Sequence, residues 1–467
     1  MRKRYLLIIL TFFLLIGIAA CKKKPSQNGD TPPETDPDKP GVGEVVDFSK
    51  IIKKQVEITV WLDDQSGEYS AELIAEFNKT EAGRNIKVNH RHEGSVESRE
   101  RLKTVGKTGG GPDVFQFPHD HLSSAILEDL VFALPQSTRD LVNARSHPIG
   151  AKIAQVQYDD QTKEYGPGSN ASVRLFAMPT SIESVGLYYN KNLISEENVP
   201  KTMEDLLTKG TQWNSQVASD GSGRTNAEKG WRYLTTSSHF ADSYFMQGFY
   251  SAFGYQPFGP NLDNKNAIGF KSEEIKAALT WFRDSLKPVV TGDSTDPAGK
   301  GVDFEAGNIP LVIAGPWNIE AYKAKGKDVI DLGVAKMPTV AGRETKTYAG
   351  AIMTAVYKYS NNRDAAVKFV EFMNSDIAME LLYKHKGKLP ALKTELLDNI
   401  EGVSTDELLM AMSEQLETSI PMPTIPEVQH YWGPGENLIK SVWKGDDIDT
   451  AMDEAQDSYE ALAKLGS

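Results

Sequence analysis

The stretch that decides the fold is VEITVWL at residues 56–62, a short run rich in β-branched and aromatic residues. This composition predicts a strand, and the apolar spacing of residues 69–79 predicts an amphipathic helix directly after it. The same alternation continues with a strand at 86–88, a helix at 96–105 and a strand at 113–117. Strands that alternate with helices are typical of a parallel sheet with right-handed crossovers, so the sequence predicts an α/β fold.

The alternation indicates where a ligand would bind. Ligands of open α/β sheets bind beyond the carboxyl ends of the strands, so we expect a site near the loops after Leu62 and Phe117.

Further along, Ser272 and two glutamates predict the start of a helix whose apolar positions step by three and four until Pro288 ends it. A second amphipathic pattern, from Ile448 to Leu462, predicts a helix docked on the body of the protein.

Composition and charge exclude several classes of protein. The chain has 467 residues, enough for two or three domain-sized units, and a formal net charge of −13 at pH 7. Such a negative protein does not have the electrostatics of a nucleic-acid-binding protein. A single cysteine excludes an internal disulfide framework and a structural zinc site built on cysteines.

The N-terminus has the organisation of a secretory signal. A basic segment, Met1 to Arg4, precedes an uncharged apolar run and then the small residues before Cys21. The apolar run is short for a permanent membrane helix, which needs about 20 residues. The sequence Ile18-Ala19-Ala20-Cys21 resembles the lipobox of bacterial lipoproteins, which implies a signal peptide at 1–20 and a lipid on Cys21. Ordinary secretory cleavage at the same small residues is the alternative.

The residues after Cys21 are predicted to form a tether. Residues 25–47 contain five prolines, two glycines of a Pro-Gly-x-Gly run and no aromatic side chain. Such a segment buries too little apolar surface to fold. We therefore predict a lipidated cysteine and a disordered tether at 21–51. The mature protein would then be anchored by acyl chains to the extracellular or periplasmic face of the cell membrane.

Catalytic and metal-binding motifs are incomplete. Gly106-Lys107-Thr108 looks like the end of a P-loop, but the required earlier glycine is replaced by Arg101. The pairs His90 with His92 and His119 with His121 have no third ligand nearby in sequence, so we interpret them as solvent-facing residues. The loop that starts at Asp220 has tryptophan where a calcium loop needs a bidentate glutamate. The sequence therefore predicts no metal and no cofactor.

Several separated motifs carry a family resemblance. Four blocks occur in this order: Gly110-Gly111-Pro112-Asp113 with Pro118-His119-Asp120; Met178-Pro179 with Glu183 and Leu187-Tyr188-Tyr189-Asn190-Lys191; Ala306-Gly307 with Ala314-Gly315-Pro316-Trp317; and Met422-Pro423-Thr424-Ile425-Pro426-Glu427 with Tyr431-Trp432. The set resembles the extracellular solute-binding proteins of ABC sugar importers, and the last block resembles their maltose and maltodextrin-binding branch.

The resemblance implies a two-lobe fold of the periplasmic-binding-protein type II class, with a ligand cleft between lobes that are joined by a hinge. By analogy, lobe 1 comprises residues 52–181 and 344–389, and lobe 2 comprises 186–338 and 394–467. The hinge crossings are then expected at 182–185, 339–343 and 390–393. Binding of sugar is expected to draw the lobes together.

The resemblance also implies a set of sugar-binding residues. A pyranose has apolar C–H faces and a rim of hydroxyls, so its receptor needs aromatic rings and charged or amide groups. The expected aromatic platforms are Phe117, Tyr244, Trp317 and Trp432. The expected hydroxyl-binding groups are Asp63, Gln65, Ser66, Glu100, Asp120, His121, Glu183 and Glu436. His121, Ser66 and Glu436 stand where family members often have cations, which leaves the exact sugar open. Trp61 is expected in the core.

The function implied is a non-enzymatic receptor. It would capture a maltose or maltodextrin-type oligosaccharide as a monomer and deliver it to ABC permease subunits driven by a cytoplasmic ATPase. Two alternatives stay open at this stage. One is a receptor for another oligosaccharide, such as a galactoside or a xylan fragment. The other is a surface carbohydrate hydrolase, for which Glu183 and Asp120 would be the acid and base candidates.

Overall fold

The computed structural model describes residues 55–159, 161–162, 164–165 and 171–465. The chain divides into two units, 1–38 and 39–467, and only the second contains described residues. The predicted signal peptide, the lipid site at Cys21 and the tether up to residue 51 therefore lie outside the described residues.

The first sheet confirms the predicted alternation. Strand β1 (Val56–Leu62) pairs in parallel with β2 (Ile86–His92) and with β3 (Val114–Pro118). Helices α1 (Glu68–Lys79) and α2 (Ser95–Val105) connect these strands. The sheet is nevertheless mixed, because β12 (Tyr348–Val356) runs antiparallel to β3 and to β7 (Met178–Ser184). The short strand β13 (Ile420–Pro421) completes it beside β12.

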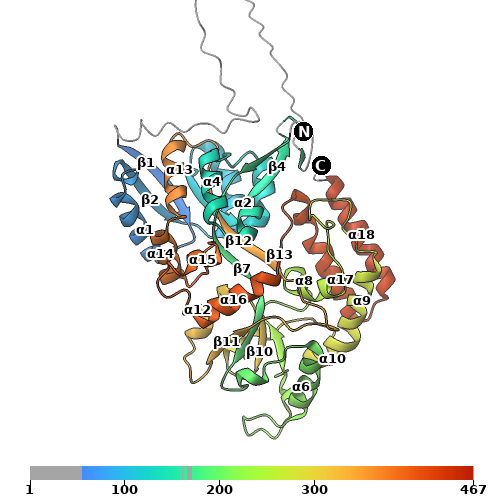
Figure 1. Ribbon diagram of the computed structural model, residues 1–467. Helices are drawn as coiled ribbons and strands as arrows, with labels where there is room; N and C mark the ends of the chain where they lie inside the picture. Colours follow the sequence, from blue (N-terminus) through green and yellow to red (C-terminus); the bar gives the residue numbers. More distant parts are fainter. Residues whose placement is uncertain (1–54, 160, 163, 166–170, 466–467) are drawn as a thin grey trace, which may run out of the picture. The chain divides into compact units, whose positions relative to one another are not determined.

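The part of the chain built on this six-stranded sheet is lobe 1. Helices α1 and α14 (Asp376–Lys386) lie side by side in it (Figure 1). The other helices of this region are α3 (Leu122–Leu127), α4 (Gln136–Arg145), α5 (Pro148–Ile153) and α13 (Arg363–Phe372). Two later helices, α15 (Thr394–Leu397) and α16 (Glu407–Thr418), follow in the chain, and α16 contacts strands of both sheets. A separate small sheet has the order β5-β4-β6, with β4 at Gln155–Asp159, β5 at Glu164–Tyr165 and β6 at Ser172–Leu175.

Lobe 2 is built on a second sheet of order β11-β8-β10-β9. Its strands are β8 (Gly186–Asn190), β9 (Leu234–Thr236), β10 (Leu311–Ala314) and β11 (Leu332–Ala335). Its helices are α6 (Met203–Ser215), α7 (Asn226–Lys229), α8 (Ser243–Ala252), α9 (Glu273–Trp281), α10 (Lys287–Val290), α11 (Gly301–Glu305), α12 (Ile319–Lys323), α17 (Trp432–Lys444) and α18 (Ile448–Leu465). Helices α17 and α18 pack against each other (Figure 1).

The predicted helix from Ser272 differs from the structure at its end. Ser272 caps α9 as expected, with its hydroxyl accepting a hydrogen bond from the Ile275 N–H at 3.3 Å. The prediction that Pro288 ends the helix is wrong, because a π-helical turn at Phe282–Leu286 leads directly into α10. In this turn the Lys287 N–H donates to the Phe282 carbonyl, five residues earlier. The wider turn relieves the conflict between a proline and the preceding helical carbonyls.

The chain passes between the two sheets through a buried polar network, which we call the hinge network (Ser184, Thr347, Gln415 and Ser419). Only Val185 separates β7 from β8. The Thr347 hydroxyl lies 2.7 Å from that of Ser184 and 2.9 Å from that of Ser419. The Gln415 amide donates to the same Thr347 oxygen at 3.1 Å and accepts from the Met337 N–H at 2.8 Å. One hydroxyl therefore links segments that are far apart in sequence.

The lobe boundaries remain predictions, and the pairing of strands bears on the last of them. The prediction assigns residues from 394 onward to lobe 2. In the structure, β13 pairs with β12 of the first sheet, whereas α16 packs against β11 of the second sheet and also against β7 of the first. Ile425 is packed in the cluster that contains the core of lobe 2. The segment that contains α16 and β13 therefore contacts both sheets, and the position of the last crossing stays a prediction.

Candidate sugar-binding site

One pocket of about 220 Å³ collects side chains from seven separate parts of the chain. Lobe 1 contributes the turn after β3, the end of β7 and the start of β12, whereas lobe 2 contributes the start of α8, the turn after β10 and the start of α17. The segment directly after β13 adds Met422. The lining residues are Pro118, His119, Asp120, Glu183, Tyr244, Trp317, Gly350, Ala351, Met422 and Trp432. The expectation that a site follows β3 agrees with this position. The loop after β1 does not line the pocket.

Aromatic rings form one side of the pocket. The ring of Tyr244 lies 6.3 Å from that of Trp317 and 6.2 Å from that of Tyr348, and Tyr348 meets Trp432 edge to face at 6.2 Å. Trp317 is 44% exposed, which is unusual for so large an apolar ring and leaves it accessible to a ligand. A Cβ at Gly315 would lie 2.2 Å from the Trp317 ring, so only glycine at position 315 lets the ring lie over the backbone there.

Two carboxylates face these rings in the lining. Asp120 lies in a 3₁₀ turn at His119–His121, and the Gln429 amide donates to its Oδ2 at 3.1 Å and to its backbone carbonyl at 3.0 Å. Glu183 lies in β7, where burial raises the pKa of its carboxyl and the nearby Lys388 opposes that rise. Burial, reinforced by Glu183, Asp120 and Asp242, keeps the pKa of Tyr244 well above its usual value. The pocket therefore offers a phenol donor beside carboxylate acceptors.

His119 is a pocket residue that the sequence analysis placed wrongly, as a solvent-facing histidine. Only 1% of it is exposed, and its Nδ1 accepts the Ala351 N–H at 3.2 Å. Burial lowers the pKa of His119 to about 4, so the ring is neutral at pH 7 and its proton is on Nε2. Among the described residues, Nε2 has no hydrogen-bond partner. Gln429, Tyr348 and Gly350 were also missed, and only their short distance in sequence from the quoted motifs could have indicated them.

Phe117 is a correction to the predicted site. It was expected as an aromatic platform, but it is 0% exposed and packs in the core, with its ring 5.1 Å from that of Phe115. The first four residues of β3 are all buried, so this strand has no face that is open to a ligand. Trp61, in contrast, is in the core as predicted.

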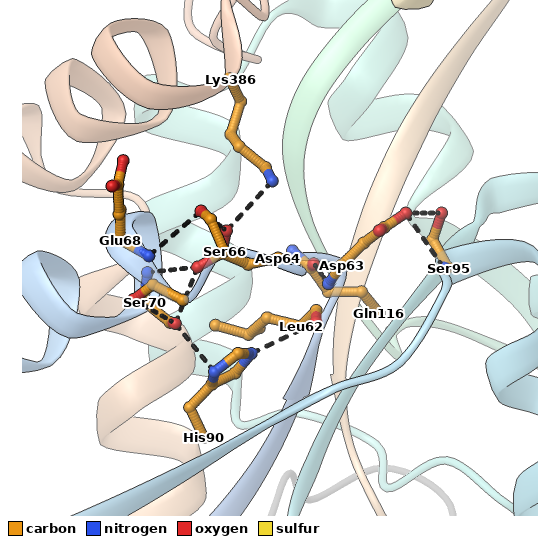
Figure 2. A network of polar contacts seen from close by, with 11 residues as sticks. Leu62, Asp63, Asp64, Ser66, Glu68, Ser70, His90, Ser95, Gln116 and Lys386 are labelled. Atoms are coloured by element: carbon orange, nitrogen blue, oxygen red, sulfur yellow. Dashed lines mark hydrogen bonds and ion pairs between the residues drawn. The ribbon is translucent and has the colours of Figure 1, made fainter.

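The loop after β1 holds three predicted residues that the structure does not bring to the pocket. Figure 2 shows two of them, Asp63 and Ser66, in a local network of polar contacts. Asp63 accepts from the backbone and hydroxyl of Ser95 at 3.2 and 3.1 Å, so it anchors the start of α2. Ser66 donates to the buried Asp64 at 3.3 Å, and Gln65 is exposed. Asp63 and Ser66 therefore make local contacts, and none of the three residues lines the pocket.

Asp64 is the centre of that network. Burial alone would raise its pKa, but hydrogen bonds from the N–H and hydroxyl of Ser70, both at 2.8 Å, and the Lys386 ammonium at 3.3 Å hold the pKa at about 2. The Ser70 hydroxyl also lies 2.9 Å from Nδ1 of His90 (Figure 2). The network ties the loop after β1 to α14.

Three more predicted residues lie outside the pocket lining. Glu100 is 57% exposed in its side chain and pairs with Arg99 at 2.6 Å and with Lys103 at 3.2 Å. Burial lowers the pKa of His121, which follows Asp120 in the same turn. Glu436 pairs with Lys440, one helical turn later on α17. The structure brings together Asp120, Glu183, Tyr244, Trp317 and Trp432 from the predicted set.

The described residues provide no alternative metal chemistry. Within them, no three His, Cys, Asp or Glu side chains are grouped as a metal site would require. Likewise, no helix in residues 55–465, apart from the gaps, combines the length and apolar character needed to cross a membrane.

Comparison with known proteins identifies relatives along most of the chain. A galactooligosaccharide-binding protein of Bacillus subtilis is 27% identical over 426 residues, 89% of this chain and 91% of the relative. A maltooligosaccharide ABC transporter solute-binding lipoprotein of Streptococcus pneumoniae is 28% identical over 408 residues, 85% of this chain and 87% of the relative.

Solved structures share the two-lobe fold. A cyclo/maltodextrin-binding protein in complex with maltotetraose superposes with a TM-score of 0.69 at 23% identity, over 87% of this chain and 97% of that protein. The maltose-binding periplasmic protein MalE of Listeria monocytogenes, in complex with maltose, gives the same TM-score at 24% identity, over 88% and 99% of the two chains. The family described as bacterial extracellular solute-binding protein matches residues 72–411. This chain therefore belongs to the bacterial extracellular solute-binding proteins.

Proposed function

We propose that this protein captures a maltose or maltodextrin-type oligosaccharide and delivers it to the membrane subunits of an ABC importer. The observation that carries the proposal is the convergence of Tyr244, Trp317 and Trp432 with Asp120 and Glu183 in one pocket. Aromatic rings match the C–H faces of a hexose, and carboxylates accept hydrogen bonds from its hydroxyls. The names of two relatives, which refer to maltooligosaccharides and maltodextrin, support this ligand class.

A second ligand class also has support. The relative from Bacillus subtilis that is 27% identical is named for galactooligosaccharides. Galactose differs from glucose in the orientation of one hydroxyl, so the hydrogen-bonding groups of the pocket would distinguish the two sugars. We favour glucose units because Met422 and Trp432 belong to the motif that resembles the maltodextrin-binding branch.

We assign no catalytic role to Glu183 or Asp120. The family is one of solute-binding proteins, and Asp120 is already held by Gln429. The proposal includes a lipid on Cys21, a monomeric receptor on the outer face of the membrane, and permease subunits driven by a cytoplasmic ATPase as partners. Mass spectrometry of the membrane-extracted protein should find residues 1–20 absent and a diacylglyceryl group on Cys21.

Titration calorimetry of the full chain in mild detergent tests the ligand. Maltose, maltotriose and longer maltodextrins should bind, whereas galactooligosaccharides and xylan fragments should bind weakly. Stronger binding of galactooligosaccharides would assign the second ligand class, and no heat from any of these sugars would refute a sugar receptor. Prolonged incubation with maltodextrin should release no shorter sugar. Release above that of a Glu183→Gln control would support the hydrolase alternative.

A further inference from the structure

A pair of hydrogen bonds between the lobes holds one of the carboxylates of the pocket. The side-chain amide of Gln429 donates to Oδ2 of Asp120 at 3.1 Å and to the Asp120 backbone carbonyl at 3.0 Å. Asp120 is on lobe 1, in the turn after β3, whereas Gln429 is in the 3₁₀ turn at Pro426–His430. We call this pair of hydrogen bonds the Gln429 clasp.

The Gln429 end of the clasp is fixed to lobe 2. Val428, the residue before Gln429, is fully buried and belongs to the hydrophobic cluster that contains the core of lobe 2. The 3₁₀ turn also packs against α17 and α18, and only Tyr431 separates it from α17. The Gln429 amide therefore follows lobe 2 when the lobes move.

The Asp120 end of the clasp is fixed to lobe 1. His119, the residue before Asp120, is buried, and its Nδ1 accepts the Ala351 N–H of β12 at 3.2 Å. The clasp occupies Oδ2 and the backbone carbonyl of Asp120, and no donor among the described residues reaches Oδ1. One oxygen of this pocket carboxylate is thus held by the protein, and the other remains for a sugar hydroxyl.

We propose that Gln429 is a positioning residue for the sugar site, which acts through Asp120 and not by touching the ligand. The inference rests on the proposed function of the pocket and adds a residue that tunes its affinity. The clasp orders the Asp120 carboxylate in advance, so less freedom is lost when a hydroxyl binds Oδ1. Because the clasp joins the lobes, it also raises the population of the closed arrangement before sugar arrives, and this increases the apparent affinity.

Titration calorimetry of the full chain with maltose tests the effect on affinity. Gln429→Ala should bind maltose about tenfold more weakly than wild type, because a hydrogen bond to a charged acceptor is lost. Gln429→Glu has nearly the same shape and should bind more weakly still, since its carboxylate lacks the donor and repels that of Asp120. Thermal unfolding checks that each variant is folded.

Small-angle scattering tests the effect on closure without any sugar. Sugar-free Gln429→Ala and sugar-free Asp120→Ala should both have a larger radius of gyration than sugar-free wild type. At saturating maltose, Gln429→Ala should reach the same radius as wild type. Equal sugar-free radii in Gln429→Ala and wild type would show that the clasp does not favour closure, and would overturn that part of the proposal.

A double-mutant cycle separates positioning from direct contact with the sugar. In an Asp120→Ala background, the further change Gln429→Ala should alter the affinity for maltose by less than about twofold, because the group through which Gln429 acts is already absent. The same loss in both backgrounds would mean that Gln429 contacts the sugar itself, and would overturn the proposal. Unchanged maltose affinity in the single variant would overturn it as well.

Gln456→Ala is the matched control. The Gln456 amide donates to the Glu460 carboxylate at 2.9 Å within α18, so this variant removes the same kind of hydrogen bond without joining the lobes. It should leave maltose affinity and the sugar-free radius unchanged, and an equal loss in the control would contradict a specific role of Gln429. Failure of wild type to bind any sugar would instead refute the proposed function. The sugar-free radius still tests the clasp in that case, so the two failures are distinguishable.

Discussion

Trp432 shows how one side chain can serve the ligand more than the fold. Its ring is half-buried, meets Tyr348 and Tyr431 edge to face at 6.2 and 5.1 Å, and lines the pocket. We expect Trp432→Ala to weaken maltodextrin binding by about 2 kcal/mol or more, the scale of a buried aromatic anchor. The melting temperature should change much less than it does for the buried Trp443→Ala. Calorimetry and thermal unfolding measure both quantities. Normal sugar binding by Trp432→Ala would place the site elsewhere.

The surroundings of Asp64 predict how the free energy of unfolding depends on pH. Its folded-state pKa of about 2 lies below the ordinary value of 3.8, so the ionised form stabilises the fold at pH values above 3.8. That contribution is on the order of 2 kcal/mol and is lost as the pH falls from about 4 through 2. Asp64→Asn should therefore lower the free energy of unfolding at pH 7, and the difference from wild type should shrink as the pH is lowered toward 2.

Denaturant unfolding at a series of pH values measures this effect. Glu68→Gln is the control, because Glu68 is an exposed acid at the start of α1, the helix that contains Ser70. It should leave the pH dependence unchanged. A difference between Asp64→Asn and wild type that stays constant down to pH 2 would show that the loss arises from packing and not from the charge.

At the residue scale, residue type predicts whether a side chain is buried. It does not predict whether a buried side chain points into the core or into the pocket. Phe117 and His119 are two positions apart on β3 and the turn after it, yet the first is in the core and the second lines the pocket. Both are almost fully buried. A strand that is buried on both faces has no polar alternation, so its sequence does not reveal which residues face a ligand.

At the scale of elements, the hinge network predicts an effect of one hydroxyl. Thr347→Val has nearly the same shape but removes the oxygen that meets Ser184, Gln415 and Ser419. The buried Gln415 amide then keeps only its longer hydrogen bond to the Thr418 hydroxyl, at 3.4 Å, and the Ser184 hydroxyl loses its contact with Thr347. We therefore expect the free energy of unfolding to fall by about 1–3 kcal/mol. Thr208→Val, on an exposed face of α6, should have a much smaller effect. Denaturant unfolding tests this, and equal effects of the two variants would contradict the role of the network.

The helix after Ser272 marks the limit of predicting elements from sequence. Its start and its buried face, which includes Ile275, Leu279 and Phe282, follow from capping and periodicity and are confirmed. Its continuation past Pro288 requires a π turn, whose extra residue changes the helical register. Core packing of Phe282 and Leu286 stabilises this register, and packing between distant segments is invisible in a local pattern.

At the scale of the whole molecule, ligand binding and lobe closure should be one linked equilibrium. The pocket takes residues from both sheets, so a sugar that contacts both favours the arrangement in which they are close. Small-angle scattering should show a smaller radius of gyration with maltodextrin. Trp432→Ala should need a much higher sugar concentration to reach the same value. A radius that does not change at saturating sugar would contradict closure on binding.

Residue types and their short-range spacing were enough to predict the α/β class, the order of the first strands and helices, the buried positions of the main helices, and the family motifs. These features depend on residue type and on spacings of two to four positions, and both can be recognised in a short stretch of sequence. The folded arrangement was needed to show that Asp120, Glu183, Tyr244, Trp317 and Trp432 line one pocket, whereas Asp63, Ser66 and Glu100 make local contacts. The reason is that meeting requires chain crossings and strand pairing between residues hundreds of positions apart, and their geometry is set by the packing of two sheets and not by any local pattern.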